Sequence, residues 1–242
     1  MITLPQLAST MEYPGRFLIT SNTLDSIIAT YGVTARSASS RAKRYVASKD
    51  ATTIHVEPTD DKIMEQGNLD LLDYTAVHFF KNGIVIGNGR QTDLIKTLDG
   101  PAVDLLSINL REETYEPDKY STPRITGCVA ISNDVWSTAL HIIRDDGKGK
   151  STHNSFQLDI NSENTYFIST YAGPNTRPTP SFAGGPIPLE PFNGSAKEIA
   201  EYIYTAYAPS LEKEDLRVSV VVVAINKTTA RAIYRIINSV DR

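Results

Sequence analysis

Two stretches of the chain carry the residue types best suited to holding an anion. One is Tyr31-Gly-Val-Thr-Ala-Arg36-Ser37-Ala-Ser-Ser-Arg41, and the other is Gly87-Asn88-Gly89-Arg90-Gln91-Thr92-Asp93. Forked guanidinium groups, small hydroxyls and a backbone opened by glycine suit a phosphorylated or otherwise anionic small molecule. Neither stretch matches a standard phosphate-binding motif, so they predict the class of ligand and not its identity.

Two further segments could complete such a site. An acidic run from Arg111 to Asp118 contains Glu116, and Thr122-Pro-Arg124 opens an apolar segment. Taken singly, the four places are ordinary: a basic surface loop, a helix entry, a solvated helix end and a strand entry. Taken together, they supply arginines for an anion, hydroxyls and amides for orientation, and a carboxylate for proton transfer.

Several other chemistries lack the residues that they need. The four histidines are far apart and lack helical ligand spacing, so we predict no metal site and no cofactor. The single cysteine, Cys128, lies in the apolar run Ile125 to Ile131, which indicates a buried, inert thiol. No nucleophile elbow, P-loop or dinucleotide-binding glycine motif occurs.

Composition narrows the class of protein. The chain has 242 residues, 40% of them hydrophobic and 21% charged, which is ordinary for a soluble protein. The net charge of −4 argues against a nucleic-acid partner held by bulk charge. No leader segment and no run of about eighteen apolar residues is present, so we expect no membrane association and a cytoplasmic protein. No linker or repeat divides the chain, which predicts one domain over residues 1–242.

Short segments rich in β-branched and aromatic residues predict a strand-dominated fold. A hairpin is expected over residues 74–86, with Asn82-Gly83 supplying positive φ angles. Turn residues such as Asn161-Ser162 separate later strands. The expected strands are Arg16 to Thr20, Asp25 to Thr34, Thr52 to Glu57, Arg124 to Ser132, Val135 to Ile143, Asn154 to Ile160, Thr165 to Tyr171 and a central Leu216 to Ile225.

Few helices are expected. Residues 91–99 and 101–112 are predicted helices, and the capping box Ser195 to Glu198 opens a third, Ala196 to Tyr207. Residues 1–12 read as a loose lead-in, 173–194 as a long proline-rich loop, and 228–240 as either helix or strand. Because the strands come in hairpin-like runs, the pattern predicts an α+β protein with mainly antiparallel sheets, and not a Rossmann or barrel fold.

Several short motifs occur along residues 13–171 in a definite order and spacing. They are Tyr13-Pro-Gly15-Arg16, Tyr31-x-Val-x-x-Arg36-Ser37 with Arg41, Tyr74, Asn88-Gly89-x-x-Thr92-Asp93, Tyr115-Glu116, Thr122-Pro-Arg124-Ile125 and Ile168-Ser-Thr-Tyr171. In this order and spacing they resemble the archaeal-type IMP cyclohydrolase family. Two positions depart from the family pattern: Thr114 stands where an acidic residue is expected, and Thr75 where an amide is expected. The chain is also longer in its lead-in, in region 43–72 and in the proline-rich loop.

The resemblance implies a fold and a reaction. The fold is a four-layer αββα sandwich like that of N-terminal-nucleophile hydrolases, without their terminal nucleophile. The reaction is the dehydrating ring closure of 5-formamidoimidazole-4-carboxamide ribotide to inosine monophosphate (IMP), the last ring closure of purine synthesis. It needs no cofactor. The only implied partners are this purine ribonucleotide precursor and further copies of the chain, as in a tetramer.

The resemblance also suggests a role for each candidate residue. Glu116 would transfer protons, and Tyr74 would orient or polarise the formyl group. Arg16 and Arg124 would contact the formyl oxygen or the phosphate. The remaining substrate-binding candidates are Arg36, Ser37 and Arg41 for the 5′-phosphate side, and Asn88, Gly89, Thr92 and Asp93 for the ribose or base edge.

Two alternative functions remain open at this point. Thr114 and Thr75 would suit a purine-nucleotide-binding or regulatory protein that has lost the chemistry. An amide hydrolase of the same layered fold would need an internal Ser or Thr exposed by processing, because Ile2 follows Met1.

Overall fold

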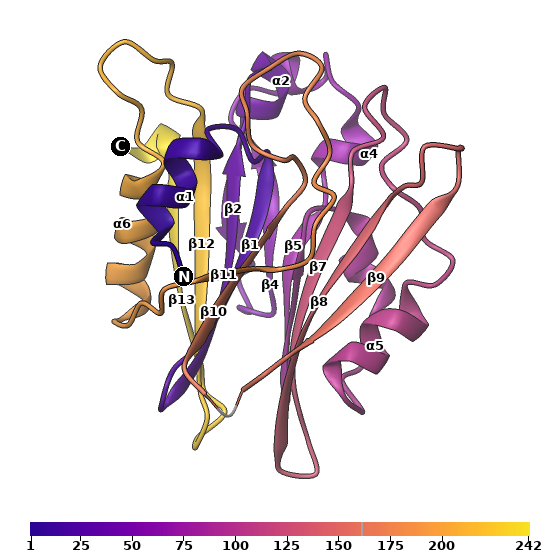
Figure 1. The fold of residues 1–242 in the computed structure, drawn as a ribbon, viewed down its shortest axis with the longest axis vertical. Helices are drawn as coiled ribbons and strands as arrows, with labels where there is room; N and C mark the ends of the chain where they lie inside the picture. Colours follow the sequence, from indigo (N-terminus) through magenta and orange to yellow (C-terminus); the bar gives the residue numbers. More distant parts are fainter. Residues whose placement is uncertain (161) are drawn as a thin grey trace.

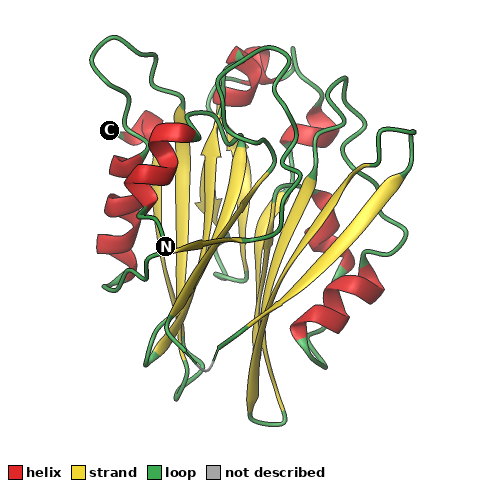
Figure 2. Cartoon of the chain, viewed as in Figure 1, coloured by secondary structure: helices red, strands yellow, loops and turns green. Residues whose placement is uncertain are grey.

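Two antiparallel sheets face each other in the computed structural model, which describes residues 1–160 and 162–242, with the side chains of residues 64, 69 and 70 left aside (Figures 1 and 2). The six-stranded sheet has the order β11 (Ile187–Leu189), β10 (Asn164–Ser169), β1 (Arg16–Asn22), β2 (Ser26–Thr34), β12 (Arg217–Asn226) and β13 (Ala232–Asn238). The seven-stranded sheet has the order β3 (Lys43–Ala47), β4 (Thr53–Pro58), β5 (Thr75–Phe80), β6 (Gly83–Gly87), β7 (Arg124–Ser132), β8 (Val135–Asp145) and β9 (Ser151–Leu158).

Helices cover the outer faces of both sheets. Helices α1 (Leu4–Thr10) and α6 (Ala196–Ala206) lie outside the six-stranded sheet, and α5 (Ala102–Asn109) lies outside the seven-stranded sheet (Figure 1). Short helices α2 (Ala38–Arg41), α3 (Asp61–Met64) and α4 (Leu69–Leu72) connect strands, and 3-10 turns occupy Arg90–Leu94 and Ser239–Asp241. The predicted α+β sandwich is confirmed, and its likeness to N-terminal-nucleophile hydrolases stays a prediction.

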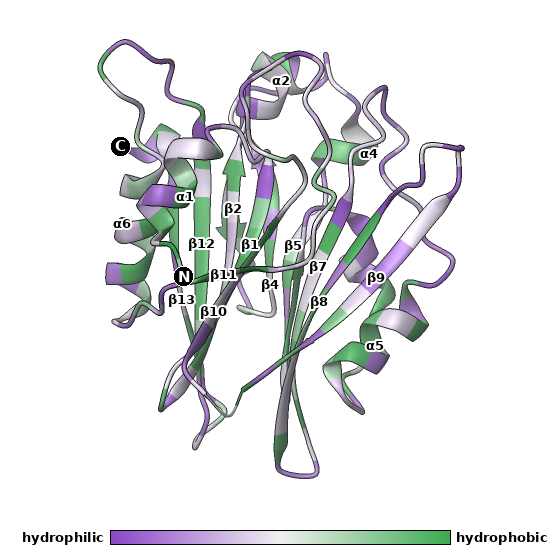
Figure 3. Ribbon diagram, in the orientation of Figure 1, coloured by the Kyte–Doolittle hydropathy of each residue, from purple (hydrophilic) through white to green (hydrophobic). Residues whose placement is uncertain are grey.

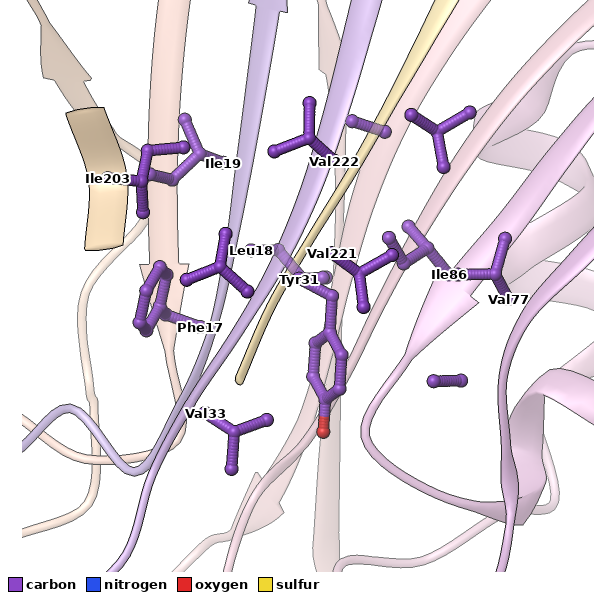
Figure 4. Packing of buried hydrophobic residues seen from close by; sticks show 14 of the residues in the cluster. Phe17, Leu18, Ile19, Tyr31, Val33, Val77, Ile86, Ile203, Val221 and Val222 are labelled. Carbon is purple, nitrogen blue, oxygen red and sulfur yellow. The ribbon is translucent and has the colours of Figure 1, made fainter. Parts of the chain in front are cut away.

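Alternation along the strands creates two apolar layers. Leu18, Tyr31 and Val221 point between the sheets toward Ile86, whereas neighbouring residues of β1 point outward to α6 (Figure 4). Hydrophobic residues follow β12, whose interior positions are all buried, whereas β9 is more polar and half-buried (Figure 3). The core therefore lies between the sheets and under α6, and a second buried cluster lies under α5.

The chain contains more regular structure near its start than predicted. Residues 1–12 are not a loose lead-in: Thr3 and Gln6 form a capping box at the start of α1, which buries Leu4 and Leu7. The prediction missed β3, because Lys43 and Arg44 interrupt its apolar pattern.

The predicted helix over 91–99 is wrong. Only a 3-10 turn forms there, because polar side chains at Gln91 and Thr92 bond to the neighbouring loop and strand. Residues 228–240 contain β13, and its partner β12 decides between helix and strand. In the β5–β6 hairpin only Gly83 has a positive φ, of 147°. The predicted turn at Asn161-Ser162 includes residue 161, which lies outside the described residues.

The capping box at Ser195 and Glu198 is confirmed, and the helix it opens ends one residue earlier than predicted. The proline-rich stretch 173–194 is irregular except for β11. Among the described residues, no helix is long and apolar enough to cross a membrane.

Candidate active site

A cavity of about 560 Å³ opens where β1, β2 and β3 meet three connecting segments. Its walls come from Tyr13 and Arg16, from the end of β2 and the start of α2, from residues 66–68, from residues 71 and 72, and from residues 116–120. Figure 1 places α2 and α4 at the same end of the sandwich. The volume lies within the range of small-molecule sites.

Glu116 is held at the inner wall of this cavity and is only 2% exposed. Its Oε1 accepts hydrogen bonds from Arg16 Nη2 and from Asn88 Nδ2, the latter at 2.9 Å. Its backbone N–H donates to the Thr122 carbonyl at 2.8 Å. Arg16 opens β1 and Asn88 follows β6, so residues from both sheets fix one carboxylate oxygen.

The second carboxylate oxygen, Oε2, accepts no hydrogen bond from any residue that the structure describes. Burial raises the pKa of Glu116, and the neighbouring Arg16 guanidinium opposes part of that rise. One oxygen is thus fixed and the other is left for a ligand. This is the arrangement that a positioned proton-transfer group requires.

Asn88 ties Glu116 to the seven-stranded sheet. It is fully buried, its Oδ1 accepts from the Ile125 N–H at 2.6 Å, and its Nδ2 also donates to the Pro123 carbonyl at 3.1 Å. Both donors and the acceptor are therefore used within the protein. Asn88 acts here through Glu116 and not through a free group of its own.

Lys43 also lines the cavity, and the sequence prediction missed it. This first residue of β3 is 3% exposed. Burial and, to a smaller extent, the Arg16 charge lower the pKa of Lys43 to about 7, and the Glu116 carboxylate opposes part of that shift. The spacing Lys43-x-Tyr45-x-Ala47 is a period of two, and it could have placed this lysine on the inner face of a strand.

Three buried tyrosines stand behind the cavity. The Tyr74 hydroxyl lies 2.5 Å from that of Tyr31 and 2.8 Å from that of Tyr45. Burial raises the pKa of all three phenols, so they remain protonated near neutral pH. Tyr74 is 5% exposed and stands outside the cavity lining, beside the Lys43 amine, which is 5.8 Å from its ring centre.

The two arginines predicted for the phosphate have other partners. Arg36 donates to Asn175 Oδ1 at 3.1 Å, to the Thr176 carbonyl at 2.8 Å and to Thr179 Oγ1, and it lies over the Tyr13 ring. Arg41 pairs with Glu214. Neither arginine lines the cavity, although Ser37 between them does. Their binding role stays a prediction.

The remaining candidates lie away from the cavity. Arg124 shares the α5-facing side of β7 with Cys128, and donates to the Thr114 carbonyl at 2.9 Å and to Gln91 Oε1 at 3.2 Å. Gly89 packs against the Arg124 guanidinium.

Two more of the predicted binding residues form bonds within the protein and do not line the cavity. Thr92 Oγ1 donates to the Thr75 carbonyl at 2.6 Å, and Asp93 Oδ1 lies 2.7 Å from His78 Nε2. The structure therefore brings Arg16, Asn88, Glu116, Ser37 and, close behind the lining, Tyr74 together, and does not bring Arg124, Gly89, Thr92 or Asp93 to the cavity.

The described part of the chain contains neither a cluster of metal-binding side chains nor a reactive thiol. No group of three or more His, Cys, Asp or Glu side chains is placed there to hold a metal ion. Burial raises the pKa of Cys128 to about 12, which agrees with the predicted inert thiol.

Fold and site together define an αββα sandwich with a carboxylate-containing pocket at one end of its sheets. The chain belongs to the family described as IMP cyclohydrolase-like protein, whose sequence model matches residues 13–229. The family predicted from the motifs is confirmed.

Relatives named IMP cyclohydrolase occur in several archaea. The chain is 26% identical over 163 residues to that of Methanosphaera stadtmanae, covering 66% of this chain and 73% of the relative. It is 36% identical over 137 residues to that of Haloquadratum walsbyi, covering 55% and 63%. For the Haloarcula marismortui protein the identity is 32% over 122 residues, covering 49% and 55%. The match thus spans less than two thirds of the two haloarchaeal proteins.

Proposed function

We propose that this protein is an IMP cyclohydrolase, which closes the pyrimidine ring of 5-formamidoimidazole-4-carboxamide ribotide with loss of water. The observation that carries the proposal is Glu116, with Oε1 held by Arg16 and Asn88 and Oε2 unengaged at the wall of a cavity of about 560 Å³. Family membership and the names of the archaeal relatives support the same reaction.

The reaction suits a site made of positioned groups. The carboxamide nitrogen attacks the formyl carbon of the same molecule, so the protein gains rate by holding the two groups in contact and by stabilising charge on the formyl oxygen. Arg16 lies against Glu116 with its side chain 19% exposed, so its guanidinium can contact that oxygen. Glu116 Oε2 is free to accept and return a proton.

Other groups in the cavity wall suit the 5′-phosphate. Ser37, Ser39 and Ser40 line the same cavity, as does Lys119 of the 116–120 segment. Arg36 and Arg41 flank these serines, and either would have to exchange a present partner for the phosphate. A phosphorylated substrate is retained inside a membrane-bounded compartment, so we also propose that the protein acts in the cytoplasm.

A direct assay tests this proposal. Purified protein is incubated with the formamido substrate, IMP formation is followed chromatographically, and IMP binding is measured separately by calorimetry. Turnover dependent on the protein is the expected result. Glu201→Gln, which removes a carboxylate on α6 that pairs with Arg242 outside the cavity, is a matched control and should retain full turnover.

Other outcomes identify the alternatives. A protein that binds IMP and never forms it is a nucleotide-binding protein and not the enzyme. An intact mass below that of the full chain, together with amide hydrolysis, indicates a processed hydrolase of the same fold.

A further inference from the structure

Lys43 is a buried cation in the cavity that none of the roles above uses. It is 3% exposed, and its Nζ makes no hydrogen bond or ion pair with the residues that the structure describes. A buried ammonium without a carboxylate partner is costly, so such a group needs a reason to be there. Its position at the cavity wall, beside Arg16 and Glu116, supplies one.

We propose that Lys43 is the base that takes the proton from the attacking carboxamide nitrogen, while Glu116 handles the proton lost from the formamide nitrogen. This inference rests on the proposed function. It divides the two proton transfers of the ring closure between two groups that line the same cavity.

The surroundings favour a neutral amine at this position. The nearest groups that influence its charge are the Arg16 guanidinium from β1, which repels an ammonium, and the Glu116 carboxylate, which attracts one but is already paired with Arg16. The Tyr74 ring faces it from the segment before β5, and Tyr31 and Tyr45 lie behind that ring as neutral phenols. Asp118 and Lys119 lie on the 116–120 wall of the same cavity.

An amine that is partly neutral at working pH is a suitable base. Burial lowers the pKa of Lys43 to about 7, near the pH at which a general base works best. Glu116 is reserved for the second step, because Arg16 and Asn88 already hold its Oε1 and leave only Oε2 to carry a proton.

Lys43 and Glu116 together account for every proton transferred in the ring closure. The carboxamide nitrogen forms a bond to the formyl carbon, the carbonyl π pair moves to oxygen, and one N–H proton passes to the Lys43 amine. The resulting ammonium returns that proton to the oxygen, giving a carbinol. Glu116 then takes the formamide N–H proton as the C=N bond forms and the C–O bond breaks. It delivers that proton to the departing oxygen, and one water leaves.

Two substitutions distinguish a general base at position 43 from a residue that contributes only a positive charge. Lys43→Met keeps the length of the side chain and removes the amine, whereas Lys43→Arg keeps a charge that cannot be lost. For both variants we expect kcat to fall by about 10²-fold or more, with the affinity for IMP little changed. In the wild type, kcat/KM should rise with pH with an apparent pKa near 7, and this pH dependence should be absent from both variants. Lys49→Met, which alters an exposed lysine in the β3–β4 turn, is the control and should behave as wild type.

A second readout does not depend on turnover. In protein labelled with ¹³C at lysine Cε, the resonance missing from Lys43→Met should titrate near pH 7 in the wild type. Titration only near the ordinary lysine value would overturn the proposal, even if the variants fold poorly.

The kinetic outcomes are equally decisive. Restored turnover in Lys43→Arg, or a raised KM with unchanged kcat in Lys43→Met, would make Lys43 a binding cation instead. If the wild type forms IMP and Lys43→Met does so equally well, this inference alone fails. If the wild type forms no IMP, the proposed function fails and takes this inference with it.

Discussion

Glu116 shows how much of the site depends on fixing a single atom. Oε1 is bound from β1 by Arg16 and from the residue after β6 by Asn88, so both sheets must be in place before the carboxylate is positioned. The ligand-facing oxygen then needs no rearrangement when substrate arrives. Preorganisation of this kind lowers the barrier, because the cost of orienting the group is met during folding.

Replacing Glu116 by Gln tests this role. Glutamine keeps the shape and an oxygen that can accept from Arg16 and Asn88, and it removes the proton-transfer capacity. We expect kcat to fall by at least about tenfold, a bound below the usual contribution of such groups. IMP affinity should change little, because the product makes no use of proton transfer. Steady-state kinetics with calorimetry measure both quantities, and unchanged turnover would contradict the assignment.

The sequence identifies some site residues and not others, for a physical reason. Arg16 opens β1, Asn88 follows β6 and Glu116 lies in the segment before β7, so the motifs that contain them lie at strand ends. Lys43 was missed because lysine is rarely buried, which outweighed the period-two spacing that it shares with Tyr45. Arg124 was expected at the site, and its place two residues before Thr126 on an outward-facing row of β7 puts it behind the sheet. One residue of register decides which face a strand side chain occupies.

At the scale of elements, the long strands were predicted, whereas the short strands β3 and β11 and the short helices were missed. Runs such as Leu216 to Ile225 contain only residues that fit a buried strand, so composition alone decides them. Helix α1 depends on the Thr3–Gln6 capping box, a signal as clear as the one at Ser195, which was recognised. Segment 228–240 could not be assigned locally, since pairing with β12 decides it.

The loop after β10 is fastened by Arg36. This guanidinium bonds to Asn175, Thr176 and Thr179 and lies 4.1 Å from the Tyr13 ring centre. We therefore expect Arg36→Ala to speed amide hydrogen exchange through residues 174–181, and a rise in KM would follow if the loop helps to retain substrate. Exchange followed by mass spectrometry measures this.

Arg41→Ala provides the comparison for that experiment. Arg41 makes one ion pair with Glu214, whose side chain is 65% exposed, and such pairs contribute about 0–1 kcal/mol. Exchange in 174–181 should stay as in the wild type. Equal effects of the two substitutions would show that Arg36 does not fasten this loop.

At the scale of the whole molecule, we propose that the protein assembles into a homo-oligomer. The stretch 173–194 has six prolines, which restrict the free chain and so reduce the entropy lost when a surface loop is ordered against a partner. Light scattering at micromolar concentration should give a multiple of the 26.6 kDa chain mass. A mass near that of one chain would contradict the proposal.

The unfolding free energy should also depend on the protonation state of Lys43. Its pKa is about 7 in the folded protein and near the ordinary 10.5 when unfolded. Between these values the unfolded chain holds more protons at this position, so the unfolding free energy rises with pH. The cost of burying Lys43 is greatest below pH 7 and is relieved progressively as pH approaches 10.5.

We therefore expect Lys43→Met to be more stable than wild type at pH 7. The difference in unfolding free energy should narrow by on the order of 1 kcal/mol per pH unit toward pH 10. Urea midpoints across this range measure the gap, and groups common to both proteins cancel in the comparison. Lys49→Met should give a curve parallel to the wild type, because its side chain is exposed in both states. A parallel curve for Lys43→Met would show instead that Lys43 keeps an ordinary pKa in the folded protein.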